Sequence, residues 1–141
     1  ILEFIKKNKL TKIDSIVYLQ PTSPFRKHNH INTCLSKFKK NKNKTLVSIK
    51  KVNFSIFKCI SLNSKGLNPI FDEKFLTSNR QSFPEVYIPN GAIYIFLVKD
   101  FLKNKSIPHK NSIPFLMNEK DSLDIDSISD LRLARNLWKI L

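Results

Sequence analysis

The succession of segments near the start of the chain constrains its fold more than any other feature. Residues 15–20, SIVYLQ, form a short apolar and β-branched run that stops at Pro21, as expected of a buried strand of a parallel sheet. Apolar residues repeated at i, i+3, i+4 and i+7 then predict a helix that starts near His28, and residues 45–49, TLVSI, predict a second strand. This order indicates an α/β sheet with a right-handed parallel crossover. The apolar face of the helix consists of Ile31, Cys34, Leu35 and Phe38.

Further apolar segments extend this architecture beyond a long irregular middle. Residues 90–96, NGAIYIF, predict another buried strand. Gly91 at its start permits either a bulge or the close approach of a ligand. The other expected elements are a strand at 54–60, a turn around Gly66, a short helix at 98–104 and a strand at 113–117.

Both ends of the chain have helical patterns. Residues 1–5 resemble the middle of an amphipathic helix, so we expect a segment upstream of them. Ser127 followed by Asp130 is typical of a capping box at the start of a last helix. The apolar stripe expected on that helix consists of Leu131, Ala134 and Trp138.

The charge of the chain favours a solvated basic surface. A formal net charge of +14 ordinarily indicates a polyanion partner. However, only four of the 25 basic residues are arginine, and the lysines lie among many Asn and Ile residues, as in proteins from AT-rich genomes. The densest run, residues 37–44, is typical of a helix end and the loop that follows. We therefore expect no nucleic-acid partner.

The remaining composition indicates a cytoplasmic protein without a membrane partner. No uncharged apolar stretch reaches membrane-spanning length, and the first residues do not resemble a signal peptide. Cys34 and Cys59 lack the spacing of a zinc site, so we expect both to be reduced and buried. The histidines are expected at the surface, at positions His28, His30 and His109.

Three segments contain polar residues at positions that the packing of a hydrophobic core does not explain. They are LQPTSPFR at residues 19–26, NGAIYI at 90–95 and DSLDID at 121–126. Their order and separation resemble the acylneuraminate cytidylyltransferase (CMP-N-acetylneuraminic acid synthetase) family. The resemblance covers the whole chain, but only roughly the last two thirds of that family's catalytic domain.

The resemblance implies a Rossmann-like nucleotide-diphospho-sugar transferase fold, with a mostly parallel sheet and flanking helices. The family's N-terminal nucleotide-loop segment is expected to be lacking, since the chain has only two glycines and no Gly-rich phosphate loop. Residues 1–141 would then be one partial cytidylyltransferase domain. Within it, residues 51–83 are a candidate dimerisation or substrate arm, because the family commonly forms homodimers.

Several candidate site residues follow from the resemblance. Gln20 ends a strand at the edge where open α/β sheets bind ligands, and is assigned to the sugar. Arg26 can hold a carboxylate or phosphate, or can instead tie its loop to its own domain. The composition also favours a solvent-facing Lys58, and a core position stays open for Tyr94. The other residues assigned to the substrate are Lys58, Arg80, Asn90 and Tyr94.

A carboxylate pair is the chemical centre of this interpretation. Asp124 and Asp126 lie two residues apart, so in an extended segment both side chains project to the same face and can share a divalent cation. The resemblance makes them the catalytic and Mg²⁺-binding residues. The alternative is that both are acidic residues favoured by the dipole of the following helix.

The implied reaction is attack of the sugar's anomeric hydroxyl on the α-phosphorus of CTP, with release of pyrophosphate. The motif NGAIYI at residues 90–95 favours a nine-carbon acidic sugar, namely sialic, legionaminic or pseudaminic acid. An alternative is a truncated, non-catalytic remnant or half-enzyme that binds sugar or metal without turnover. A third hypothesis is a nucleic-acid-binding domain, and the positive net charge is the sole argument for it.

Overall fold

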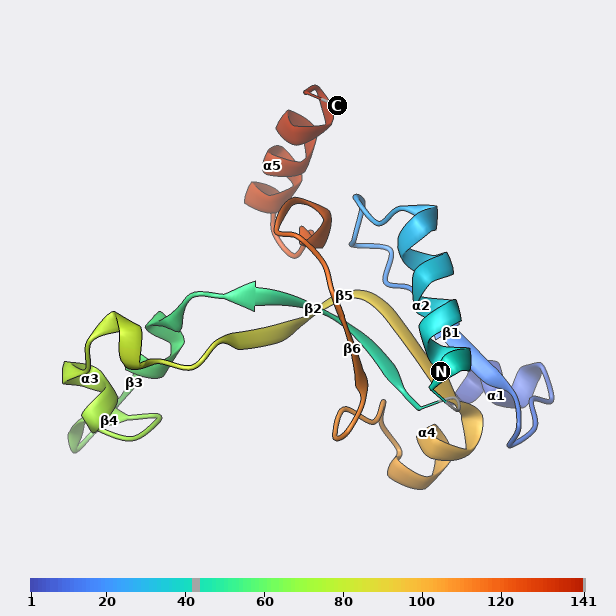
Figure 1. Cartoon of the computed structure of the whole chain (residues 1–141), viewed down its shortest axis with the longest axis horizontal. Coiled ribbons are helices and arrows are strands. Elements are labelled where there is room, and N and C mark those ends of the chain that lie inside the picture. Colours follow the sequence, from blue (N-terminus) through green and yellow to red (C-terminus); the bar gives the residue numbers. More distant parts are fainter. Residues whose placement is uncertain (42–43, 141) are drawn as a thin grey trace. The chain divides into compact units, whose positions relative to one another are not determined.

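A mixed four-stranded sheet organises the larger of two compact units in the chain. The structure is a computed structural model that describes residues 1–41 and 44–140, and Figure 1 shows its elements. The first unit comprises residues 1–50 and 89–141, and the second comprises residues 51–88. Residues 42–43 of the predicted basic run lie outside the described part.

The strands of the sheet follow the order β1, β5, β2, β6. Strand β1 (Ser15–Tyr18) is antiparallel to β5 (Val86–Leu97), whereas β2 (Leu46–Val52) is parallel to β6 (Ile113–Leu116). The prediction of an α/β fold is thus confirmed, but the prediction of a mostly parallel sheet is wrong.

Burial explains why strand direction could not be predicted. From Asn90 onward β5 is buried on both faces, and such a strand is continuously apolar whether its neighbours are parallel or antiparallel. Strand β1 lies at the edge of the sheet, and its Ile16 is buried while Val17 is 37% exposed. The expectation that β1 is a fully buried strand is therefore also wrong.

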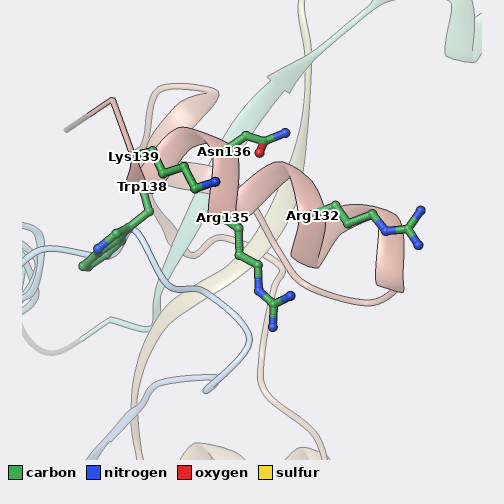
Figure 2. A pocket seen from close by; sticks show the side chains of 5 residues that line it. All are labelled: Arg132, Arg135, Asn136, Trp138 and Lys139. Atoms are coloured by element: carbon green, nitrogen blue, oxygen red, sulfur yellow. The ribbon is translucent and has the colours of Figure 1, made fainter.

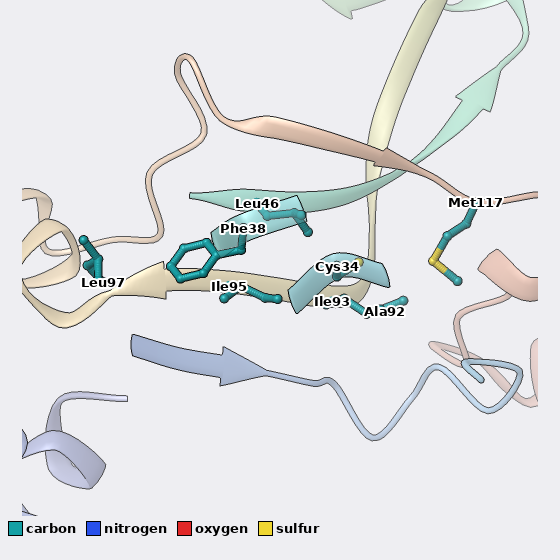
Figure 3. Close-up of a cluster of buried hydrophobic side chains, with 8 residues drawn as sticks. All are labelled: Cys34, Phe38, Leu46, Ala92, Ile93, Ile95, Leu97 and Met117. Atoms are coloured by element: carbon teal, nitrogen blue, oxygen red, sulfur yellow. The ribbon is translucent and has the colours of Figure 1, made fainter. Parts of the chain in front are cut away.

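Two hydrophobic clusters cover the two faces of β5. Ile93, Ile95 and Leu97 belong to one cluster, and the alternating residues Tyr94 and Phe96 belong to the other, as the two-residue period of a strand requires. Helix α2 (His28–Lys40) starts where predicted and supplies Cys34 and Phe38 to the first cluster, drawn in Figure 3. Helices α1 (Leu2–Lys7) and α4 (Val98–Asn104) supply Ile5, Val98 and Phe101 to the second.

The second unit is small and aromatic. It contains the 3₁₀ helix η1 (Phe54–Lys58), the hairpin of β3 (Ile60–Asn63) and β4 (Gly66–Pro69), helix α3 (Lys74–Thr77) and the 3₁₀ helix η2 (Arg80–Ser82). The turn before Gly66 is confirmed. The predicted strand at 54–60 is wrong, because the Asn53 side chain accepts a hydrogen bond from the Ser55 N–H and starts a 3₁₀ turn. Phenylalanine rings pack together within the unit: Phe54, Phe57, Phe71, Phe75 and Phe83.

The cysteines and the last helix differ in part from expectation. Cys34 is fully buried, which raises its thiol pKa to about 12, but Cys59 is exposed, against the prediction.

Helix α5 (Ile128–Trp138) follows the 3₁₀ helix η3 (Lys120–Ser122) and has the predicted capping box at Ser127. Of its predicted stripe, Ala134 is buried, whereas Trp138 is 66% exposed. In the described ranges, no helix is long and apolar enough to cross a membrane.

A buried carboxylate fastens the start of α2 to the turn after β6. Asp121 Oδ1 lies 3.0 Å from Lys27 Nζ, and its Oδ2 lies 3.5 Å from His30 Nε2 and accepts a 2.9 Å hydrogen bond from Asn118 Nδ2. His30, expected at the surface, is therefore largely buried. Burial alone would raise the Asp121 pKa, but the hydrogen bonds from Lys27 and Asn118 and the charges of Lys27 and His30 outweigh it and hold that pKa below 3.8.

Asp121→Asn should lower the free energy of unfolding near pH 7 by about 1–3 kcal/mol, since Lys27 and His30 then lose their charged partner. Because the folded-state pKa of Asp121 is lowered, its contribution is present above the ordinary value of 3.8 and is lost as the pH falls through the folded-state value. Urea unfolding at several pH values measures this. A difference between wild type and variant that does not shrink as the pH falls below 3.8 would contradict the assignment.

Candidate functional site

Three segments bring polar side chains together around Gly91. This residue has a φ of +76°, and a Cβ placed on it would overlap Gln20 Oε1 and lie 3.1 Å from Asp124 Oδ2. Only glycine both adopts this backbone conformation readily and leaves room for the two side chains. Gln20 follows β1, Gly91 lies in β5, and Asp124 follows η3. We call Gln20, Gly91, Tyr94 and Asp124 the polar cluster.

Tyr94 adds a phenol to this cluster. It is 9% exposed, and its ring centroid lies 6.0 Å from that of Tyr18. Burial raises the pKa of the Tyr94 hydroxyl, and the nearby negative charge of Asp124 raises it further, while the Gly91 backbone opposes the shift. The high pKa keeps the hydroxyl neutral, so that it can donate a hydrogen bond.

Asp124 presents a carboxylate with unused hydrogen-bonding capacity. Its Oδ1 is buried and finds no hydrogen-bond partner in the described part of the chain. The neighbouring Ile125 N–H donates to the Thr22 carbonyl at 2.9 Å, which holds the extended segment against the loop after β1. A buried carboxylate oxygen without a partner is costly and is typical of a position that a cation or a hydrogen-bond donor completes.

Arg26 is engaged with the backbone beside the cluster. Its Nη1 donates to the carbonyls of Gln20 and Ala92, each at 2.9 Å. The guanidinium thereby joins the end of β1 to β5. Of the two interpretations left open by the sequence, these contacts support the one in which Arg26 ties its loop to its own domain.

Asn90 lies in the core beneath the cluster. It is 3% exposed, and its side chain is hydrogen-bonded to Ser48 and Ser122. The predicted contact between the Asn90 amide and the sugar stays a prediction. The hydrogen bonds of Asn90 to Ser48 and Ser122 do not support it. Neither serine was singled out in the sequence, although a serine inside the apolar run TLVSI requires a buried partner and was a usable signal.

Lys58 and Arg80 lie in the second unit, where each packs on an aromatic ring. Lys58 Nζ is 5.7 Å from the centroid of the Phe83 ring, and Arg80 Cζ is 5.4 Å from that of Phe54. Such cation–π contacts orient both cations within their own unit. Their substrate-binding roles stay predictions.

The second carboxylate of the predicted metal site is less constrained than the first. Asp126 is exposed, and its backbone N–H donates to Asp130 Oδ2 at 3.2 Å, near the helix cap. In residues 1–41 and 44–140, no group of three or more His, Cys, Asp or Glu side chains is placed to hold a metal. Mg²⁺ commonly takes one or two protein carboxylates, with water and substrate oxygens completing the shell. The unpartnered oxygen of Asp124 fits one such ligand.

A basic hollow of about 530 Å³ on α5 lies on different residues from the polar cluster. Figure 2 shows that its side chains point in different directions and do not converge on a common point. Trp138 at one end lies 6.1 Å from the Phe25 ring, measured between ring centroids, and so packs α5 against the loop after β1. The hollow is lined by Arg132, Arg135, Asn136, Trp138 and Lys139.

Gln20 after β1, Tyr94 within β5 and Asp124 after η3 thus give this α/β domain an amide, a phenol and a carboxylate near Gly91, polar groups of the kind that line ligand sites in such folds. Comparison with known proteins identifies which proteins of this class the chain is related to. The chain is 33% identical over 131 residues to the CMP-N,N'-diacetyllegionaminic acid synthase of Legionella pneumophila, covering 90% of this chain and 55% of that protein. It is 34% identical to the N-acylneuraminate cytidylyltransferase of Escherichia coli, covering 94% of this chain and 32% of that protein.

A third relative, the pseudaminic acid cytidylyltransferase of Campylobacter jejuni, is 28% identical over 90% of this chain and 55% of its own length. No protein-family model matches the chain. The chain is thus related to cytidylyltransferases of nonulosonic acids, which confirms the resemblance seen in the sequence. It spans about half the length of two of these curated relatives and about a third of the other.

Gly91→Ala should disrupt the polar cluster, because the added methyl group displaces the Gln20 side chain. A positive φ costs a non-glycine residue about 1–2 kcal/mol in unfolding free energy, and the displacement adds to this cost. Gly66→Ala is the matched control, since Gly66 also has a positive φ, of +111°, with no described atom within 4 Å of an added Cβ. The Gln20 side-chain amide signals in NMR spectra should move in the first variant and stay in the second. Unchanged Gln20 signals in Gly91→Ala would contradict the described packing.

Proposed function

We propose that this chain is part of a cytidylyltransferase that transfers CMP from CTP to a nine-carbon acidic sugar for cell-surface polysaccharide biosynthesis in the cytoplasm. The sugar is a sialic, legionaminic or pseudaminic acid. The observation that carries the proposal is the convergence of Gln20, Tyr94 and Asp124 around Gly91 in a chain related to enzymes with these names.

In the proposed reaction, the anomeric oxygen forms a bond to the α-phosphorus of CTP. The bond between that phosphorus and the oxygen bridging to the β-phosphate breaks, pyrophosphate leaves, and the anomeric hydroxyl loses its proton. The protein's contribution is positioning and electrostatic stabilisation. Because Asp124 and Gln20 both lie against Gly91, charged phosphate chemistry and sugar recognition can occur side by side.

The proposed substrate-binding residues, inside and outside the polar cluster, have distinct roles. The Gln20 amide can both donate to and accept from sugar hydroxyls. The Tyr94 hydroxyl, held neutral by burial and by Asp124, donates to the sugar. Arg26 holds Gln20 in place through its backbone carbonyl. Lys58 and Arg80 supply positive charge suited to the sugar carboxylate.

Asp124 and Asp126 are the proposed Mg²⁺ ligands and catalytic residues. When bound, Mg²⁺ supplies charge neutralisation at the phosphate oxygens of CTP. The buried, unpartnered oxygen of Asp124 supports this assignment more strongly than the exposed position of Asp126 does.

A second candidate function is a non-catalytic half-enzyme that binds sugar or metal without turnover. The chain spans 55% or less of these three relatives, so catalytic turnover by residues 1–141 is part of the proposal and needs its own test.

We also propose that residues 51–83 serve as a dimerisation or substrate arm of a homodimer. Exposed apolar side chains on its hairpin, such as Leu62 at 79% and Leu67 at 67%, are consistent with burial against a partner. A mass measured by light scattering should equal twice the chain mass. A monomeric mass at all accessible concentrations would contradict this arm assignment.

Pyrophosphate release from CTP and Mg²⁺ in the presence of each of the three sugars tests the proposed function. Turnover with at least one sugar is expected, and Asp124→Asn should reduce kcat about 100-fold or more, since a charge at the reacting phosphate is lost. A matched control is Asp100→Asn, a partly exposed carboxylate in the first turn of α4. Sugar or Mn²⁺ binding without pyrophosphate release would instead establish the half-enzyme, and no binding of sugar or metal would contradict both functions.

A further inference from the structure

We infer that Ser48, Asn90 and Ser122 form a buried positioning network that sets where Asp124 lies against Gln20 and Gly91. Its catalytic meaning rests on the proposed function, whereas its structural content can be measured without turnover. Asn90 is in this view a positioning residue and not a sugar ligand. We call these three residues the serine–asparagine network.

Short hydrogen bonds connect the three side chains. Ser48 Oγ donates to Asn90 Oδ1 at 2.6 Å, and Asn90 Nδ2 donates to Ser122 Oγ at 2.9 Å. The Ile93 N–H donates to Ser48 Oγ at 2.7 Å, which anchors the network to the backbone of β5. Ser48 and Ser122 are fully buried and Asn90 is 3% exposed, so water does not compete for these bonds.

The Asn90 amide has no capacity left for a sugar. Its oxygen accepts from Ser48 and, at 3.2 Å, from the Ala92 N–H, which together occupy both lone pairs. Its nitrogen has two hydrogens, one directed to Ser122 and the other to Met117 Sδ at 3.3 Å. A sugar hydroxyl could bind this amide only by replacing one of these buried partners, which would then be left unsatisfied.

The network joins the two segments that build the polar cluster. Asn90 immediately precedes Gly91 in β5, and Ser122 lies two residues before Asp124. Ser48 lies in β2, the neighbour of β5 in the sheet, and provides a fixed reference for both. A fully satisfied polar network has directional bonds and so specifies one arrangement of these segments, which apolar contacts of similar size would not do.

A spectroscopic test uses Ser48→Ala in the full chain. Ser48 has no described hydrogen bond to Asp124 itself, and its own bonds go to Asn90 and to the Ile93 N–H of β5, so a shift at Asp124 would have to be transmitted through this network or through β5. We expect the side-chain carboxyl ¹³C signal of Asp124 and the side-chain amide of Gln20 to shift. The control is Ser36→Ala, because Ser36 Oγ bonds the Asn32 carbonyl within α2 at 2.9 Å. Unshifted Asp124 and Gln20 signals in Ser48→Ala would overturn the inference.

A second variant, Asn90→Asp, covers the case in which Ser48→Ala does not fold. A protonated aspartate has one O–H donor and a carbonyl oxygen, so it can keep the bonds to Ser48 and Ser122 and loses only the one to Met117, whereas an ionised one also lacks the donor for Ser122. Burial raises the pKa of such a carboxyl. The Asp124 signal should therefore be close to wild type near pH 5 and should move away from it as the pH rises to about 8. A variant that matches wild type across this whole range would also overturn the inference.

Kinetics separate positioning from sugar contact once turnover is observed. If the network positions Asp124, Ser48→Ala should lower kcat about 10-fold and change the sugar KM less than about 2-fold. A raised sugar KM at unchanged kcat would instead indicate that the network acts on sugar binding, against the inference. If the wild type releases no pyrophosphate, the proposed function fails, and the NMR shifts alone decide on the network.

Discussion

The burial of β5 on both faces is the constraint on which the rest of this structure depends. From Asn90 to Leu97 the strand is covered, on one face by the cluster around Cys34 and Phe38, and on the other by the cluster around Ile5 and Phe101. A strand in this position has no solvent-facing side, so a polar side chain within it must be satisfied by the protein. Asn90 meets this requirement through Ser48 and Ser122, and the same bonds hold the segment that carries Asp124.

Gly91 marks the point where this buried strand meets the polar cluster. Its missing side chain lets Gln20 and Asp124 approach the backbone, and its positive φ turns the strand there. Arg26 joins the segment after β1 to β5 through the Gln20 and Ala92 carbonyls. The Gln20 amide and the Asp124 carboxylate are thus held against the backbone of β5, an arrangement that the proposed electrostatic catalysis would require before any ligand binds.

Helices were predicted from the sequence better than strand directions were. The starts of α2 and α4 and the capping box of α5 follow from local signals, namely apolar spacing and the Ser127–Asp130 pair. The antiparallel pairing of β1 with β5 is a non-local property, and a doubly buried strand such as β5 has the same pattern in either direction. The 3₁₀ turn at Phe54 starts with a local hydrogen bond to the Asn53 side chain, which the apolar pattern does not indicate. Cys59 is exposed in the small second unit, against the general tendency of free cysteines to be buried. The motifs included Gln20, Gly91 and Asp124, but the partners of Ser48 and Asp121, which lie far away in the sequence, are visible only in the three-dimensional contacts.

The measurement that tests the central claim most directly is an NMR titration of the isotope-labelled chain with N-acetylneuraminic acid in the presence of CMP and Mg²⁺. If the polar cluster is the sugar site, the largest shifts should occur at the Gln20 side-chain amide and at the backbone amides of Gly91 and Ala92. The signals of α5 around Arg135 should change little. Shifts confined to α5, or no saturable shift at Gln20 and Gly91, would contradict the account.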